Sequence, residues 1–230
     1  ALTDNGGAFS VWFKVHDSPG QNSLNPLIYK LNHSNPANGL GIYLGTYQAG
    51  PNDPQYLQGR IRFVSDDDLT PTTAGDIIAL NTWYHAVLTW DASTVYLYRD
   101  GMLISSQAKD ATISYDENIG VQIGFTNASS GTSGYANAIA DDARIYNRTL
   151  SASEVKQLYN MGNSKANTTP PSKLTSGLVG HWTFDGNKMT SNVADSSGQG
   201  NNLRLTNFTS TTTGIWKIVQ ALNFYGEDKN

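Results

Sequence analysis

Short runs of alternating apolar and polar residues, separated by turn-forming residues, recur along the whole chain. In residues 9–15 the apolar side chains of Phe9, Val11, Phe13 and Val15 fall on alternate positions, which puts them on one face of a strand. Similar runs predict strands at residues 27–31, 40–44, 60–64, 83–90, 94–99, 102–106, 120–125, 138–146, 178–184, 201–205 and 220–224. So many short strands with turn signals between them predict an all-β fold.

Two local signals are more specific. The pair Asp100-Gly101 stands between two of these runs and predicts a tight hairpin, because both residue types tolerate positive φ. Ser151-Ala152-Ser153-Glu154 is a capping box, and the apolar stripe after it predicts one short α-helix near residues 151–160, which Gly162 can end. Residues 161–173 are rich in Gly, Asn, Ser, Thr and Pro, a composition typical of a linker.

Three sequence blocks resemble the second half of a laminin-G-like, concanavalin A-like domain: WYHAVLTWD at 83–91, VYLYRDG at 95–101 and DDARIYNRTLS at 141–151. Three more blocks resemble the beginning of such a domain but stand later in the chain: LVGHWTFDG at 178–186, ADSSGQGNN at 194–202 and QALNF at 220–224. The chain is therefore identified as a member of the lectin–glucanase superfamily of the bacterial LamG type 3 kind, with its halves in permuted order. The resemblance implies a two-sheet antiparallel jelly-roll sandwich.

The permuted order divides the chain into parts. Residues 1–160 resemble the middle and C-terminal part of a sandwich, 161–173 are the linker, and 174–230 supply the N-terminal strands. The resemblance implies that the first and last strands of the domain pair, which places residues 178–184 against residues 138–146. Without that partner the last strand would be an exposed sheet edge. The missing strands can come from the same chain or, by strand exchange, from a neighbouring copy.

Composition narrows the class of protein. The chain has 230 residues, 22 Gly, 8 Pro and no Cys, which excludes disulfides and thiolate metal sites and allows a secreted location. Its net charge of −4 comes without a cluster of Lys and Arg, so we expect no nucleic acid partner. No apolar run approaches the roughly 18 residues of a membrane span, so we expect no membrane insertion.

A calcium site is the strongest candidate for site chemistry. Asp141 shares strand parity with two apolar residues that follow it, so it should point toward the core, where a lone carboxylate is costly. Asp185 ends the strand expected beside it, and Gly186 and Asn187 can present backbone carbonyls. Such oxygen ligands suit Ca²⁺, and the family resemblance implies Asp141 and Asp185 as side-chain ligands. The alternative is that Asp141 caps a turn and Asp185 starts an Asx turn.

Catalysis is not expected. Glycosidases that share this general sandwich need two carboxylates held across the sugar, and the alternating Glu-x-Asp-x-Glu strand of some relatives is missing. His85 is interpreted as a hydrogen-bonded structural residue, because no serine or cysteine pairing makes it a triad member. Trp12, Tyr96 and Tyr98 have a strand parity opposite to that of the core residues, so we expect them to be exposed and to bind ligand.

Two classes of function remain. The first is a calcium-stabilised structural or adhesive repeat of the extracellular space or cell surface, which assembles with copies of itself into an array or filament by strand complementation or tandem repetition. The second is a solitary lectin-like domain that binds glycans or surface proteins. We expect the structural role, because it explains the permuted order and sugar binding does not.

Overall fold

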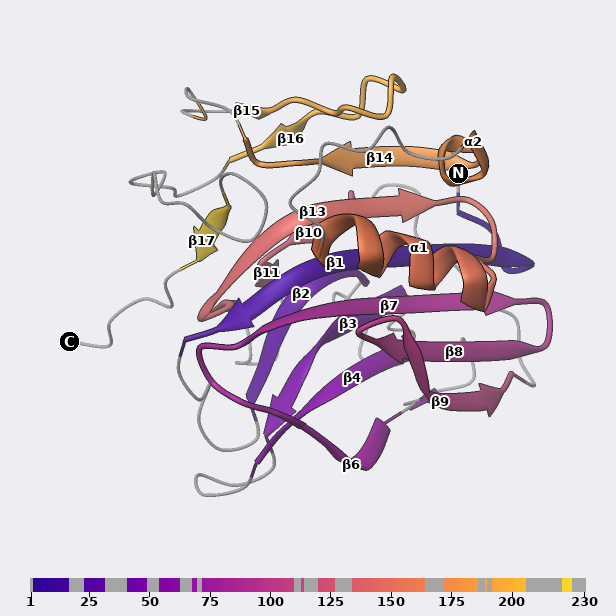
Figure 1. The fold of residues 1–230 in the computed structure, drawn as a ribbon, viewed down its shortest axis with the longest axis vertical. Coiled ribbons are helices and arrows are strands. Elements are labelled where there is room, and N and C mark those ends of the chain that lie inside the picture. The colour runs from indigo at the N-terminus through magenta and orange to yellow at the C-terminus, as the bar shows by residue number, and fades with distance from the viewer. Residues whose placement is uncertain are drawn as a thin grey trace.

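The computed structural model describes residues 2–16, 23–31, 41–48, 54–62, 68–69, 72–109, 113, 120–126, 134–163, 172–185, 189, 192–205 and 221–224. Two antiparallel sheets form the body of this described part (Figure 1). The larger sheet has the strand order β14-β13-β1-β7-β8-β9, with β17 also paired to β13. The smaller has the order β10-β2-β3-β4-β5, with β6 paired to β4.

The strands of the seven-stranded sheet are β1 (Gly6–Val15), β7 (Trp83–Asp91), β8 (Thr94–Arg99), β9 (Met102–Ala108), β13 (Ala138–Tyr146), β14 (Leu178–Trp182) and β17 (Leu222–Phe224). Those of the six-stranded sheet are β2 (Ser23–Leu31), β3 (Gly41–Gln48), β4 (Gln55–Arg62), β5 (Asp68–Leu69), β6 (Thr72–Ile78) and β10 (Gln122–Ile123). Two small hairpins pair β11 (Phe125–Thr126) with β12 (Gly134–Tyr135), and β15 (Asn192–Val193) with β16 (Leu203–Arg204). The described helices are α1 (Ala152–Asn163) and α2 (Ser172–Thr175), neither long and apolar enough to cross a membrane.

The core between the sheets is built from the alternating apolar positions that the sequence indicates. Phe9, Val11, Phe13 and Val15 of β1 are fully buried in one cluster with residues of the other sheet, such as Leu44. Burying a side chain of this size stabilises the fold by about 1.5–3 kcal/mol. The predicted two-sheet antiparallel sandwich is therefore confirmed.

The predicted hairpin is also present. Asp100 and Gly101 join β8 to β9 with φ angles of 51° and 77°, the positive values that this tight turn requires. The sequence pattern did not predict β6, in which Gly75 and Asp76 interrupt the apolar alternation. The pattern also places the start of the next strand at residue 60, whereas β4 begins at Gln55.

Helix α1 covers the outer face of the seven-stranded sheet (Figure 1). The predicted capping box is formed: the Ser151 N–H donates to Glu154 Oε2 (2.9 Å), and the Glu154 N–H donates to Ser151 Oγ (3.4 Å). Burial opposes ionisation of Glu154, but hydrogen bonds from Arg148 and Ser151 outweigh it and lower its pKa to about 2. The helix and sheet share a second apolar cluster, which comprises Ala8, Val87, Tyr98, Tyr146, Leu150, Val155, Leu158 and Leu174.

The last turn of α1 touches β1. The helix continues to Asn163, so Gly162 lies inside it and does not end it as its sequence position indicates. A Cβ atom at Gly162 would lie 2.1 Å from Nε1 of Trp12. Glycine is therefore needed here for the close approach of helix and sheet.

The C-terminal segment closes the edge of the larger sheet within the same chain. Strand β14 pairs antiparallel with β13, with Trp182 opposite Ala143. Strand β17 pairs with the earlier part of β13, with Leu222 opposite Ala140. Trp182 and Phe184 enter the core between the sheets. The predicted pairing of residues 178–184 with the last strand of the first part is confirmed, while the proposed division into two parts and a linker stays a prediction.

A β-bulge interrupts β13 between the stretches that pair with β17 and with β14. Asp142 has a φ of 47°, and the pairing of β13 with β1 changes register at this point. Ala140 before the bulge and Ala143 after it both belong to the core, so the alternation of side chains changes phase here. Asp141 lies opposite Trp12, on the face that α1 covers. The expectation that Asp141 shares the core-facing parity of the apolar residues after it is therefore wrong.

Candidate functional site

The three aromatic residues predicted to bind ligand lie on the helix-covered face of the seven-stranded sheet. Trp12 is 1% exposed and stacks on Tyr159 of α1, with 5.6 Å between ring centroids. Tyr98 is 6% exposed, and the half-buried Tyr96 donates its hydroxyl to Asp91 (3.1 Å). The predicted exposure is wrong for Trp12 and Tyr98, because α1 covers the face to which their parity directs them. Of the three, Tyr96 alone keeps a partly exposed ring.

A buried ionic cluster lies on the same face, where β13 meets β14. Arg144 donates from Nε to Asp142 Oδ1 (3.0 Å) and from Nη2 to Oδ2 (3.1 Å), and His181 Nε2 lies 2.6 Å from Asp142 Oδ1. Burial opposes ionisation of Asp142, but Arg144 and His181 outweigh it and hold its pKa well below the usual range. Since His181 belongs to β14, the cluster ties the C-terminal segment to the body of the sheet.

A serine–histidine contact beside this cluster was missed by the sequence reasoning. Ser10 Oγ lies 2.9 Å from His85 Nε2, although the two residues are 75 positions apart and meet only because β1 pairs with β7. Both side chains are buried. Burial lowers the pKa of His85 to about 3, with Asp142 opposing this shift and Arg144 adding to it. A neutral imidazole shut away from water has no route to a substrate, so the contact fits the structural role predicted for His85.

The predicted calcium ligands are only partly within the described structure. Asp141 is fully buried on β13, and Asp185 is half-buried shortly after the end of β14. Gly186 and Asn187 lie outside the described residues. Within the described ranges, no three His, Asp or Glu side chains gather where they could hold a metal. The carboxylate chemistry of Asp141 and Asp185 fits Ca²⁺, so the calcium site stays a prediction.

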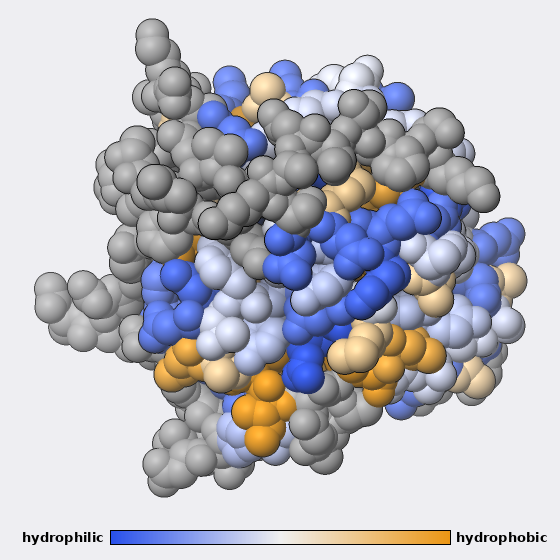
Figure 2. Space-filling view, in the orientation of Figure 1, coloured by the Kyte–Doolittle hydropathy of each residue, from blue (hydrophilic) through white to orange (hydrophobic). Residues whose placement is uncertain are grey.

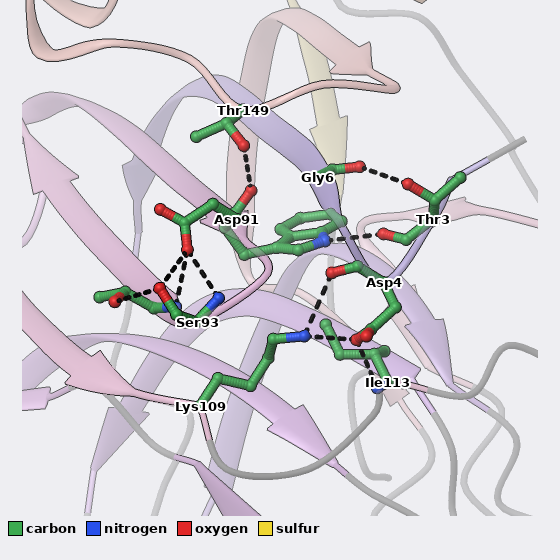
Figure 3. Close-up of polar contacts among 10 residues, drawn as sticks. Thr3, Asp4, Gly6, Asp91, Ser93, Lys109, Ile113 and Thr149 are labelled. Atoms are coloured by element: carbon green, nitrogen blue, oxygen red, sulfur yellow. Dashed lines mark hydrogen bonds and ion pairs between the residues drawn. The ribbon is translucent and has the colours of Figure 1, made fainter.

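Two other carboxylates hold the N-terminal arm and a neighbouring turn (Figure 3). Asp4 accepts hydrogen bonds from the buried Lys109 Nζ and from the backbone N–H of Ile113 (2.7 Å). Asp91 accepts from the backbone N–H of Ser93 (2.8 Å) and from the Ser93 hydroxyl (3.0 Å). Both carboxylates are engaged by protein donors, which is the pattern of structural residues and not of a catalytic acid–base pair.

The outer face of the six-stranded sheet carries two cross-strand pairs of tyrosine. Tyr29 lies opposite Tyr43, and their buried rings meet edge to face with 6.2 Å between centroids. Tyr47 lies opposite Tyr56, and both are partly exposed. Both described helices pack on the other sheet. Partly exposed aromatic rings therefore lie on this face, which neither described helix covers.

Exposed apolar side chains lie next to the pair formed by Tyr47 and Tyr56. Figure 2 shows apolar surface on the lower part of the molecule, over β9 and the β6 region of Figure 1. The large exposed apolar residues of the described part are Ile77, Leu80, Met102 and Leu103. Ile77 is 52% exposed and lies opposite Tyr56, so the row formed by Tyr47 and Tyr56 continues into this apolar surface.

The fold is an antiparallel sandwich of two such sheets, with aromatic residues on an outer face and with Asp4, Asp91 and Asp142 engaged in structural contacts. These features fit a lectin-like domain. The chain belongs to the Laminin_G_3 family of the concanavalin A-like lectin/glucanases superfamily, whose model matches residues 1–156. This confirms the resemblance that the sequence blocks indicate. No curated protein sequence matches the chain.

Solved structures of the same fold include several carbohydrate-binding proteins. A putative carbohydrate binding protein from Bacteroides ovatus has a TM-score of 0.61 at 15% identity, and the match covers 99% of this chain and 54% of that protein. The CBM40 of Ruminococcus gnavus IT-sialidase, bound to α2,3 sialyllactose, has a TM-score of 0.50 at 17% identity, covering 69% of this chain and 84% of that one. Domain 4 of AbnA, an extracellular arabinanase from Geobacillus stearothermophilus, in complex with arabinotriose, has a TM-score of 0.50 at 17% identity, covering 69% and 68%. The chain spans about half the length of the first of these proteins.

Proposed function

We propose that this chain is a non-catalytic carbohydrate-binding module. The main support is the likeness of nearly the whole chain, C-terminal segment included, to a putative carbohydrate binding protein, together with its likeness to two sugar-bound domains. At these identities the likeness concerns the fold, and the aromatic outer face of the six-stranded sheet supplies side chains of the kind that bind sugars. An extracellular or cell-surface location is part of the proposal, because glycans are displayed there.

The described carboxylates support a role without catalysis. Glycosidases hold two carboxyl groups across the scissile bond, one of them free to transfer a proton. Here Asp142 is paired with Arg144, Asp4 with Lys109, and Glu154 caps α1. Each of these groups is occupied by a structural partner, so none is available as the acid or the base.

A structural or adhesive role is the second candidate, and the way the C-terminal segment completes the sheet favours it. Strands β14 and β17 join β13 as added strands, which is the geometry that strand exchange between copies would use. Because the segment of one chain already completes its own sheet, we rank this role below sugar binding and reverse the order that the sequence favours. Calcium would stabilise either form by binding Asp141 and Asp185 near the junction.

Two measurements test these proposals. A glycan array carrying neutral and acidic oligosaccharides, arabinotriose and α2,3 sialyllactose among them, should give selective binding of the wild-type protein. Size-exclusion chromatography with light scattering should give a monomer. An empty array contradicts the carbohydrate proposal, and oligomers or filaments would promote the structural role instead.

A further inference from the structure

We infer that Asn5 is a site of spontaneous deamidation, and that the product loosens the N-terminal arm, residues 2–5, from the sheet. The inference does not depend on sugar binding. Asn5 stands directly before Gly6, in the turn between the arm and β1, and its side chain is exposed. The backbone nitrogen after an asparagine can attack the side-chain amide carbon, and glycine hinders this attack least because it has no Cβ atom.

The contacts of the turn leave the reacting groups free to meet. In the part of the chain that the structure describes, no hydrogen bond holds the side-chain amide of Asn5. The Gly6 N–H donates to the backbone oxygen of Thr3 at 3.4 Å. Because normal N–H···O bonds measure about 2.7–3.2 Å, this long contact holds the attacking nitrogen only weakly.

The reaction needs no reagent besides water. The Gly6 nitrogen gives up its proton to base in the solvent and bonds to Cγ of Asn5, and the side-chain nitrogen leaves as ammonia. Water then opens the five-membered imide ring at one of its two carbonyl groups. Opening at one carbonyl gives aspartate, and opening at the other gives isoaspartate, in which Cβ and Cγ of residue 5 belong to the main chain. Isoaspartate therefore makes the main chain one atom longer.

The extra atom falls between two anchored residues (Figure 3). On one side, Asp4 contacts Lys109 Nζ and accepts a hydrogen bond from the Ile113 N–H (2.7 Å). On the other side, Gly6 begins β1 and is tightly packed, since a Cβ atom there would lie 3.1 Å from the Thr149 backbone nitrogen. One added C–C bond lengthens the chain by about 1.5 Å. Because β1 is held in the sheet, the arm must move, and Asp4 leaves Lys109.

Lys109 is the residue that suffers from this movement. Its side chain is 1% exposed. Its Nζ atom also donates to the Asp4 backbone oxygen (3.2 Å), so both of its described contacts are with the residue that moves. A buried ammonium group that loses its carboxylate is strongly unfavourable. The isoaspartate form should therefore be less stable than the unmodified protein.

Ageing of the full chain tests the site. Wild type and Asn5→Gln are incubated at pH 8.5 and 37 °C, and peptide mapping by mass spectrometry follows each asparagine. Asn5→Gln is the matched control, because glutamine must close a six-membered ring and reacts more slowly. Asn147 is a control within the chain, since it is exposed but followed by Arg148. The other Asn-Gly pair, Asn38-Gly39, lies outside the described residues and falls in a separate tryptic peptide.

Deamidation should be at least tenfold faster at Asn5 than at Asn147. Aged wild type should melt at a lower temperature than fresh wild type, while Asn5→Gln should melt equally before and after ageing. Fresh Asn5→Asp carries the new charge without the extra atom and should melt like wild type. Lys109→Met has no buried ammonium to lose its partner, so ageing should lower its melting temperature less than that of wild type.

Two results would overturn the inference at different steps. Equal rates at Asn5 and Asn147 would show that residue 5 is not a preferred site. Conversion of Asn5 without a fall in melting temperature, or with an equal fall in Lys109→Met, would show that the product does not separate Asp4 from Lys109.

Discussion

Replacing His85 with glutamine should remove a large part of the acid sensitivity of the fold. In the structure the imidazole is buried, lies tilted against the ring of Trp12 with 5.1 Å between ring centroids, and contacts Ser10 through Nε2. Burial lowers the pKa of His85 from 6.5 to about 3. The unfolded chain therefore takes up a proton below pH 6.5 that the folded chain does not.

The sign and size of the effect follow from this difference. Stability from the neutral imidazole is fully present above pH 6.5 and is lost as the pH falls toward 3. One pKa unit corresponds to about 1.4 kcal/mol. Lowering the pH from 7.5 to 5 therefore removes about 2 kcal/mol of unfolding free energy through this one residue.

Urea unfolding at pH 7.5, 6 and 5 measures this loss of unfolding free energy, provided that the m-value is the same at each pH. In His85→Gln the amide nitrogen takes the place of Nε2 beside Ser10 but does not titrate, so the variant should lose about 2 kcal/mol less than wild type over this range. Ser10→Ala removes the hydroxyl and keeps the imidazole, so it should show the wild-type pH dependence. Equal pH dependence of wild type and His85→Gln would refute the reasoning.

Three further changes test other contacts. Gly162→Ala should destabilise the protein by about 1–3 kcal/mol in a thermal melt, because its Cβ would lie 2.1 Å from Trp12 Nε1; wild-type stability would contradict the close contact. Glu154→Ala should lower the unfolding free energy by about 1 kcal/mol at neutral pH in urea, because the Ser151 N–H loses its acceptor; at pH 2, where about half of Glu154 is protonated in the folded protein, the difference should shrink. Wild type should melt at a higher temperature in Ca²⁺ than in EGTA and Asp141→Ala should not; identical melting of wild type in both would remove calcium from the proposal.

Local sequence signals predicted local structure well. Alternation placed Phe9 and Phe13 in the core, Asp100-Gly101 gave the hairpin, and the capping box at Ser151 gave the start of α1. Each depends on residues within a few positions of one another. The pairing of β13 with β14 spans a longer distance and was predictable through the family resemblance, which fixes the order of strands.

The features that the sequence did not predict depend on contacts between residues that are far apart in the chain. Alternation tells on which face Trp12 lies, but not that Tyr159 covers that face. No glycine in the sequence indicates the bulge at Asp142, so the face of β13 on which Asp141 lies was predicted wrongly. The partner of His85 comes from another strand, 75 positions away in the sequence. The register of paired strands and the packing of a helix over one face of a sheet are set by the tertiary structure. No local signal in a single sequence predicts them.

The strands of the larger sheet that come last in the sequence are also the last to be synthesised. Because synthesis proceeds from the N-terminus, β13 leaves the ribosome before β14 exists, and β17 comes last, at Leu222–Phe224. Until then the outer edge of β13 presents unpaired backbone groups, and Trp182 and Phe184 have not yet entered the core. A nascent chain that stalls between β13 and β14 would therefore expose a sheet edge ready to pair with its neighbours, so this protein depends on finishing synthesis before it is protected from aggregation.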